Sequence, residues 1–194
     1  MADGWKEAGI WIWNFLSEEI VGMIEFRNVT SADAKRLWDA MLKLDLETSF
    51  MMYEPGEREG NSSLHALEEN ILEAEKYGDF WLTAEDDGRI DGYIKAERGR
   101  FRRIAHLANI VVGILSDYCG HGIGTEFFSR LGQWAKKEGI VRLELTVQCR
   151  NTAAVRLYEK CGFQIEGTKV KSMVVDGEFV DEYYMAKVMD YSAI

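Results

Sequence analysis

The 194-residue sequence predicts a mixed α+β fold, in which a central, mostly antiparallel, twisted sheet of about seven strands is flanked by about four helices. Asp87-Gly88 and Asp176-Gly177 each separate two strand-like runs and are typical of tight hairpin turns. Segments with apolar residues at helical spacing, bounded by capping residues, alternate with these strands. The chain length favours a single domain around one core.

The first third of the chain is expected to form one strand and two helices. "IEFRNV" has the composition of a short strand, and the run after it opens with Thr30 or Ser31 as N-cap. Its apolar residues at helical spacing are Leu37, Met41 and Leu44. After the loop "YEPGEREGN" we expect a helix from about Ser62 to Tyr77. The predicted apolar face of that helix comprises Leu64, Leu67, Ile71 and Leu72.

The rest of the chain continues as a meander followed by alternating helices and strands. "DFWLTAED", "DGRIDGYIKAE" and "RIAHLANIVVGIL" are strand-like, and turn signals separate them. We expect a helix from about His121 to Glu138, then the strand "VRLELTVQ" and a short helix capped by Asn151. Two long strands close the predicted order β-α-α-β-β-β-α-β-α-β-β.

Charge and cysteine content limit the classes of partner. The 23 Lys and Arg residues against 33 Asp and Glu give a net charge of −10, which argues against a nucleic acid or an anionic membrane as main partner. An acidic surface suits a cationic substrate and also serves solubility alone. Three cysteines without a CxxC pair predict free thiols, a reducing cytoplasm and no metal site. "GIWIWNFL" is too short to span a bilayer.

Residues 1–22 differ from the rest, because Trp5, Trp11 and Trp13 crowd a segment without clear periodicity. Two interpretations stay open. The segment is an N-terminal extension that is not native or a mis-called start, with Met23 as the natural first residue, or it is a helix that packs its tryptophans on the body or on a second subunit. In both cases residues 23–194 are expected to form the single domain.

The stretch "DYCGHGIGTEFF" places three glycines just before an amphipathic helix. Unpaired amides at a helix N-terminus, freed of side chains, can surround phosphate oxygens. The spacing fits neither the dinucleotide-binding fingerprint, because Thr125 stands at the sixth position, nor the Walker A loop, because no Gly-Lys-Ser/Thr follows. A pyrophosphate cradle and a purely structural turn remain as interpretations.

Two blocks of the sequence resemble the GNAT superfamily of N-acetyltransferases. "ILSDYCGHGIGTEFF" looks like the acetyl-CoA loop, whose signature is Gln/Arg-x-x-Gly-x-Gly/Ala, with Gly122 and Gly124 at the glycine positions. The likeness covers about Ile24 to Met189 and implies the GNAT acyl-CoA N-acyltransferase fold, with acetyl-CoA as cosubstrate. The second block, "LELTVQCRNTAAVRLYEKCGFQIEG", matches at Asn151, Ala154, Tyr158, Gly162 and Phe163.

The resemblance implies a set of cofactor-binding residues. The backbone of Val112 and Ile114 would hold the pantetheine arm and the thioester, and Asn151 and Ala154 would lie beside it, in a slot where two strands separate. Cys119 departs from the Gln or Arg of the signature, so we expect modestly weaker acetyl-CoA binding. The pyrophosphate would lie on the backbone amides of Gly120, His121, Gly122, Ile123, Gly124 and Thr125.

The resemblance also implies catalytic roles. Tyr158 lies two helical turns after Asn151 and would protonate the departing thiolate, although a core tyrosine is the alternative. The backbone N–H of Val112 or Ile114 would stabilise the oxyanion. Asn109 stands where many relatives have a carboxylate, which leaves the base open: the candidates are Glu144, His106 and water alone.

The acceptor wall in such proteins is usually formed by "LETSFMMYEPGEREGN" and the final hairpin, whose phrasing looks most like the branch of ribosomal-protein N-terminal, polyamine and drug acetyltransferases. Their carboxylates that could attract an amine are Glu47, Glu54, Asp181 and Glu182. Two functions are carried forward. The first is acetyl transfer from acetyl-CoA to a small primary amine or a peptide N-terminus, by direct attack in a ternary complex. The second is a non-catalytic acyl-CoA-binding or sensor protein, and either form is expected to be a homodimer.

Overall fold

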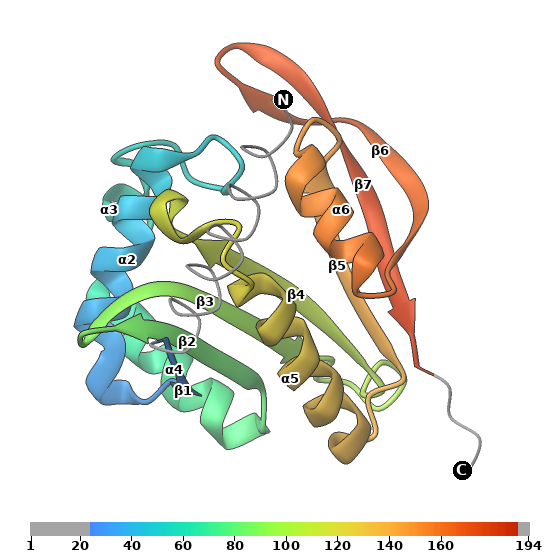
Figure 1. Ribbon diagram of the computed structural model, residues 1–194, viewed down its shortest axis with the longest axis horizontal. Helices are drawn as coiled ribbons and strands as arrows, with labels where there is room; N and C mark the ends of the chain where they lie inside the picture. Colours follow the sequence, from blue (N-terminus) through green and yellow to red (C-terminus); the bar gives the residue numbers. More distant parts are fainter. Residues whose placement is uncertain (1–23, 190–194) are drawn as a thin grey trace, which may run out of the picture.

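The computed structural model describes residues 24–189, which form one sheet with helices on both faces (Figure 1). The sheet order is β1-β2-β3-β4-β5-β7-β6, and every neighbouring pair is antiparallel except β4 and β5. The strands are β1 (Glu25–Asn28), β2 (Phe80–Asp86), β3 (Arg89–Arg98), β4 (Leu107–Ile114), β5 (Arg142–Gln148), β6 (Gln164–Val175) and β7 (Glu178–Val188). The predicted fold class is confirmed, and the interpretations of residues 1–22 fall outside the described residues.

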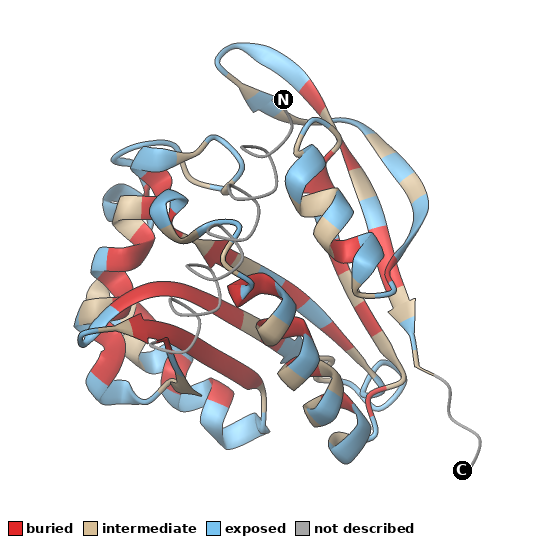
Figure 2. Ribbon diagram, in the orientation of Figure 1, coloured by how far each residue is buried: buried red, intermediate tan, exposed pale blue. Residues whose placement is uncertain are grey.

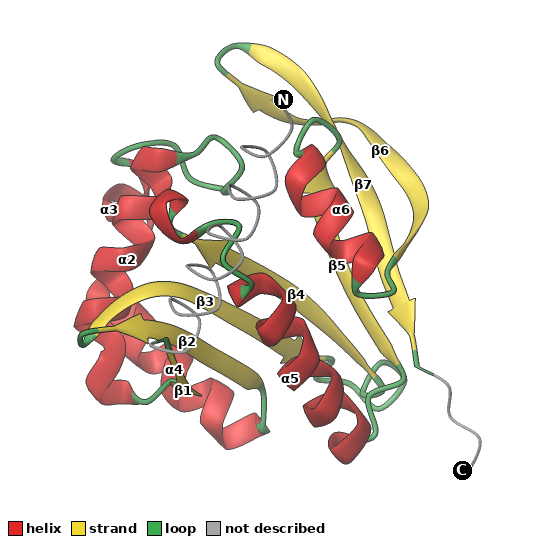
Figure 3. Ribbon diagram, viewed as in Figure 1, coloured by secondary structure: helices red, strands yellow, loops and turns green. Residues whose placement is uncertain are grey.

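Helices cover the sheet on both sides (Figure 3). Helices α2 and α4 pack on one face, and α5 and α6 pack on the other. Between residues 24 and 189 no helix is long and apolar enough to cross a membrane. The helices are η1 (Ser31–Asp33), α2 (Ala34–Glu47), α3 (Glu57–Asn61), α4 (Leu64–Tyr77), η2 (Ser116–Tyr118), α5 (Ile123–Glu138) and α6 (Thr152–Lys160).

Strand β2 supplies side chains to both cores. Phe80, Leu82 and Ala84 belong to the cluster under α5, whereas Trp81 belongs to the cluster under α2 and α4. Successive side chains of a strand point to opposite faces, so a strand covered on both sides is almost wholly buried, as Figure 2 shows. Each large apolar side chain buried in this way stabilises the fold by about 1.5–3 kcal/mol. Strand β2 is therefore held by packing on both faces, and through β3 it supports the position of β4 in the sheet.

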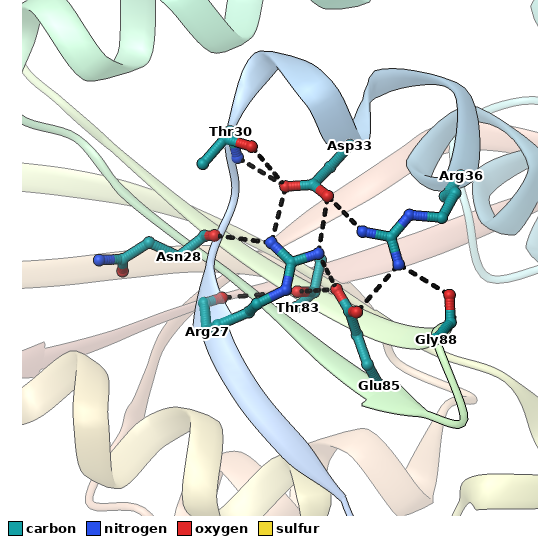
Figure 4. A network of polar contacts seen from close by, with 8 residues as sticks. All are labelled: Arg27, Asn28, Thr30, Asp33, Arg36, Thr83, Glu85 and Gly88. Carbon is teal, nitrogen blue, oxygen red and sulfur yellow. Dashed lines mark hydrogen bonds and ion pairs between the residues drawn. The ribbon is translucent and has the colours of Figure 1, made fainter.

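A buried ionic network fixes the start of α2 against the sheet (Figure 4). The Arg27 guanidinium donates to both carboxylate oxygens of Asp33, at 2.8 and 2.6 Å, and lies 2.5 Å from Glu85. Arg36 ion-pairs with the same two carboxylates. Hydrogen bonds from Arg27 hold the pKa of Asp33 well below its usual range. Because Asp33 also accepts from the Thr30 backbone N–H at 2.8 Å, the network joins β1, β2 and the helix start.

Two details of the α2–α4 region differ from the sequence prediction. The loop "YEPGEREGN" contains the short helix α3, which begins after Gly56 and is too short for a periodic signal. Leu72, predicted on the buried face of α4, is 53% exposed, because it lies about 100° around the helix from the buried Ile71. The buried residues of α4 are Leu67, Ile71 and Ala74.

Candidate active site

Strands β4 and β5 begin side by side and then separate. Their parallel ladder covers only the pairs from Leu107↔Arg142 to Asn109↔Glu144, whereas β4 stays paired with β3 up to Ile114. Figure 1 shows the two strands diverging beyond this point. We call the diverging parts, residues 110–114 and 145–148, the β4–β5 fork. Val112 and Ile114 lie on it without a strand partner on the β5 side.

The glycine loop prepares the N-terminus of α5. Gly122 is the N-cap with φ +88°, a left-handed conformation that favours glycine, and it sets the helix start at Ile123 rather than at the predicted His121. The first intrahelical hydrogen bond runs from the Glu126 N–H to the Gly122 carbonyl at 3.1 Å. The amides of Ile123, Gly124 and Thr125 precede it and so have no acceptor within the helix. These are the donors that an anion would use.

Gly124 brings the cradle and α6 together. A Cβ at this position would lie 2.6 Å from Leu157 Cδ2 on α6 and 3.6 Å from Ile114 Cδ1 on β4. Contacts of 2.6 Å are far shorter than carbon atoms tolerate, so a side chain here would force the Leu157 side chain to move. The sequence therefore uses glycine at 124 for close packing, which places the first turn of α5 next to both the fork and α6.

A cavity of about 280 Å³ lies between the β2–β3 turn and the segment that precedes α5. Its lining is polar and consists of Asp86, Arg89, Asp117, Tyr118 and His121. Two of the charged groups are bound within the protein, because Arg89 donates to Asp91 at 2.6 Å and Asp86 accepts from the Tyr118 hydroxyl at 3.0 Å.

Cys119, the departure from the expected signature, is a thiol held near β4. Its Sγ donates to the Ile114 carbonyl at 3.7 Å. Desolvation, and then the charge of Glu47, raise the pKa of this thiol above its usual value. The structure therefore gives Cys119 the character of a loop filler rather than of a reactive thiolate. Cys119, Cys149 and Cys161 are free, as predicted.

Tyr158 on helix α6 points into the hydrophobic core that lies under α5. The Asn151 side chain caps this helix by accepting from the Ala154 N–H at 3.2 Å, and Tyr158 follows two turns later. The Tyr158 ring is 7% exposed and packs edge-on against Phe128, with ring centroids 5.5 Å apart. Burial raises its pKa well above the usual range.

The two side chains that are candidates for the base, Glu144 and His106, lie away from these groups. Glu144 is at the closed end of the fork, and its carboxylate accepts from Arg142 Nε at 2.6 Å. Arg142 in turn binds Glu166. Asn109 is exposed beside Glu144. His106 is exposed before β4, at the end opposite to the glycine loop. Among the residues predicted to bind the cofactor, Gly124 thus lies close to Ile114 and to Leu157, the residue before Tyr158, whereas Glu144 and His106 lie elsewhere on the sheet.

The predicted acceptor carboxylates mostly have partners within the protein. Glu47 accepts from the Ser116 N–H at 2.9 Å and the Ser116 hydroxyl at 2.7 Å, which lowers its pKa and ties α2 to η2. Asp181 accepts from the Lys171 N–H at 2.7 Å. Glu182 is buried on β7, 3.2 Å from Lys169 Nζ. These carboxylates therefore bind neighbouring segments of the predicted acceptor wall to one another and also give that wall negative charge.

Sequence reasoning missed the contacts that join the acceptor loop to β5. Gln148, only 2% exposed, donates from Nε2 to the Ser49 carbonyl at 2.7 Å. Arg150 donates from Nε to Gln148 Oε1 at 2.9 Å and from Nη2 to Ser49 Oγ at 3.3 Å. The only available signal was a polar residue, Gln148, at the buried end of an apolar strand. We call Ser49, Phe50, Gln148 and Arg150 the acceptor-side cluster.

Comparisons with known proteins agree with this arrangement. Residues 38–163 match the acetyltransferase (GNAT) family. The L-amino acid N-acetyltransferase AaaT of Escherichia coli is 32% identical over 128 residues, which cover 64% of this chain and 76% of AaaT. Because the family match spans more than half of the chain, it confirms the predicted family and enzyme class.

Solved structures show the same fold. A GNAT acetyltransferase from Streptococcus pneumoniae superposes with a TM-score of 0.80 at 28% identity, covering 86% of this chain and 99% of its own. The yncA protein of Salmonella typhimurium, solved with its cofactor acetyl-CoA, gives a TM-score of 0.77 at 20% identity, over 88% of this chain and 97% of its own. Sequence family, sheet topology and the fork beside a glycine cradle thus agree, and the chain belongs to the acetyltransferase (GNAT) family.

Proposed function

We propose that this protein transfers an acetyl group from acetyl-CoA to a primary amine by direct attack in a ternary complex. The observation that carries the proposal is the β4–β5 fork, which opens next to both the unpaired amides of α5 and the helix that bears Tyr158. Acetyl-CoA supplies the activated acetyl thioester. The residues present fit it, because the left-handed N-cap Gly122 starts α5 so that the amides of its first turn have no acceptor within the helix.

The chain's own backbone would bind and orient the cosubstrate. The amides from Gly120 to Thr125 would hold the pyrophosphate, as a helix N-terminus favours negative charge. Val112 and Ile114, which lack a strand partner on the β5 side, would hold the pantetheine arm, and one of their N–H groups would stabilise the oxyanion. Asn151 and Ala154, joined by the cap of α6, would form the far wall.

Tyr158 would hold the proton that the departing thiolate needs. Burial raises the pKa of Tyr158, so its hydroxyl is protonated at neutral pH, as it also is at the ordinary tyrosine pKa, and protonated is the state a general acid requires. The raised pKa of Cys119 supports direct attack, because a neutral thiol is a poor nucleophile for a covalent route through cysteine.

For the proton of the amine, the geometry favours water over a side chain. Glu144 is three residues along the strand from the level of Val112, a distance of about 10 Å, and its carboxylate is paired with Arg142. His106 is six residues from Val112 along β4, about 20 Å. Glu144 could act only through a relay, so we assign it the second place.

Release of CoA thiol tests the proposal. The protein is mixed with acetyl-CoA and separate polyamines, aminoglycosides, amino acids and short peptides, and thiol and acetylated product are measured. Transfer to an amine, with no release in its absence, is the expected result. Saturable acetyl-CoA binding without release across the panel would favour the non-catalytic sensor instead.

Two lesser proposals concern the state of the protein. The free thiols of all three cysteines support a cytoplasmic location. Exposed apolar side chains on the β6–β7 hairpin, including Val174 and Phe179, support a homodimer. Sedimentation velocity ultracentrifugation gives the number of subunits directly, and a species of 22.2 kDa at micromolar concentration would contradict the dimer.

A further inference from the structure

Arg150 lies at the level of the fork where an acceptor would enter. The parallel register pairs Asn109 with Glu144, and its continuation brings Gln148 level with Gly113, between Val112 and Ile114. Arg150 is two residues beyond that level, immediately before the cap of α6. Its side chain contacts Gln148 and Ser49, so it belongs to the acceptor side of the fork rather than to the glycine loop.

The Arg150 guanidinium is oriented entirely by neutral groups. Nε donates to the Gln148 amide oxygen, Nη2 donates to the Ser49 hydroxyl, and the guanidinium carbon lies 5.9 Å from the centre of the Phe50 ring. Gln148 is itself fixed, because its Nε2 donates to the Ser49 carbonyl. The position of the guanidinium is thus set by two hydrogen bonds, while Nη1 has no partner in the described part of the chain.

Every other arginine in residues 24–189 that hydrogen-bonds to a side chain has a carboxylate among its acceptors, although Arg58 also donates to Met41 and Arg89 also donates to Tyr118. The chain carries ten more acidic than basic residues, so carboxylates are abundant. Arg150 is exposed and hydrogen-bonds to Gln148 and Ser49, and no carboxylate between residues 24 and 189 ion-pairs with it. The ion-paired arginines are Arg27, Arg36, Arg58, Arg89, Arg98, Arg100, Arg130 and Arg142.

We propose that Arg150 binds the carboxylate of the acceptor, and that the acceptor is therefore a free α-amino acid. The inference rests on the proposed transferase function and names the substrate class of that site. The Nη1 and Nη2 edge of the guanidinium retains the parallel donors that bind a carboxylate in two hydrogen bonds. In an α-amino acid the carboxylate is one carbon from the amine, so holding it at Arg150 places the nitrogen beside the fork. Polyamines and amino-acid amides lack this carboxylate.

The experiment compares acceptors that differ only in the carboxylate. The full-length protein is assayed with acetyl-CoA and an L-amino acid series, each beside its carboxamide and its decarboxylated amine, with spermidine and a dipeptide added. The variants are Arg150→Gln and Arg150→Lys. Arg150→Gln keeps hydrogen-bonding capacity without charge, and Arg150→Lys keeps the charge without the planar guanidinium. Arg102→Gln is the matched control, since Arg102 is exposed at the opposite end of β4.

The expected result is a preference of the wild type for the free amino acid over its amide. In Arg150→Gln the KM for the amino acid should rise about 10- to 100-fold, the loss that one charge-assisted contact carries, while activity on the amide and the KM for acetyl-CoA stay unchanged. Arg150→Lys should recover part of the affinity, and Arg102→Gln should match the wild type.

Three results would overturn the inference. Equal or better transfer to amides, spermidine or decarboxylated amines would leave the transferase standing and remove the carboxylate site. A raised KM for acetyl-CoA in Arg150→Gln, with amino-acid discrimination intact, would assign Arg150 to a phosphate. No transfer to any acceptor despite saturable acetyl-CoA binding would remove the proposed function, and the carboxylate site with it.

Discussion

The two sides of the β4–β5 fork differ in whether backbone groups or side chains form them. On the proposed cofactor side, backbone conformation would do the binding: Gly122 takes a left-handed φ of +88°, and the first amides of α5 have no acceptor within the helix. On the acceptor side, side chains hold distant segments together, as when Gln148 fixes Ser49. Members of the family share the cofactor, so the same backbone conformation, which depends on glycines, can serve them all. The side chains on the acceptor side must instead vary with the amine.

This difference also sets how each side should respond to substitution. A backbone cradle tolerates changes of side chain and fails when a glycine is replaced. A wall of side-chain contacts fails when one buried partner is removed, because the other is left unsatisfied. The following variants test that contrast, in order of expected effect.

Tyr158→Phe should produce the largest effect and confine it to chemistry. Loss of the general-acid hydroxyl should lower kcat by about 10²-fold or more, while the Kd for acetyl-CoA stays within twofold of the wild type. The ring remains, so its contact with Phe128 and the stability are kept. Steady-state kinetics and isothermal calorimetry measure the two quantities. Unchanged kcat would make Tyr158 a core tyrosine only.

Asp45→Ala should produce the largest loss of stability on the acceptor side. Asp45 accepts from Arg58 Nε at 2.5 Å and Nη2 at 2.9 Å, and both residues are buried. Removing the carboxylate leaves the Arg58 charge buried and unpaired, which costs about 3–5 kcal/mol. Urea unfolding measures the loss.

The control for that variant is an exposed ion pair on the same helix. Asp39→Ala removes the contact of Asp39 with Lys35, at 2.5 Å, where both side chains are more than half exposed. The expected cost is at most about 0.5 kcal/mol. Equal losses for Asp39→Ala and Asp45→Ala would show that the Arg58 contact does not anchor the segment around α3.

The same contrast explains what could be predicted from the sequence. The proposed cradle and the proposed acid could be located from the sequence because their residues follow local motif spacings: Gly122, Gly124, Asn151 and Tyr158. The fold followed from hairpin glycines and helix periodicity, and the family match confirmed it. Local pattern was sufficient wherever the constraint was on the backbone.

The acceptor-side cluster left no comparable pattern. Gln148 and Ser49 are 99 residues apart, and Arg150 and Ser49 are 101 apart, so their contacts depend on how the sheet and the loop after α2 meet. The carboxylates of the acceptor wall were identified by charge alone, and Glu47 proved to be bound to Ser116. The amino-acid composition shows that a carboxylate is present but does not show which group binds it in the folded protein.

Gly122→Ala sharpens the contrast from the cofactor side. Alanine at φ +88° costs about 1–2 kcal/mol, and rotation of the peptide that relieves this strain turns amides away from the anion. The Kd for acetyl-CoA should rise about five- to tenfold by calorimetry. Gly132→Ala, in the interior of α5 with no atom within 4 Å of the new Cβ, should instead stabilise the helix by about 0.5–1 kcal/mol. A weaker Kd in Gly132→Ala as well would mean that general helix perturbation, rather than the cap conformation, controls binding.

Cys119→Gln tests whether a side chain matters at all on the cofactor side. The family signature has Gln or Arg at this position, and a glutamine amide adds one neutral hydrogen bond, so the Kd for acetyl-CoA should fall only about two- to fivefold. Cys119→Ala should leave it unchanged, because within residues 24–189 the hydrogen bond of the sulfur goes to the Ile114 carbonyl, at 3.7 Å. A fall of a hundredfold in Cys119→Gln would mean that the side chain rather than the backbone dominates phosphate binding. The two sides of the fork would then follow one rule, and the cofactor side of this chain would be an incomplete site rather than a backbone cradle.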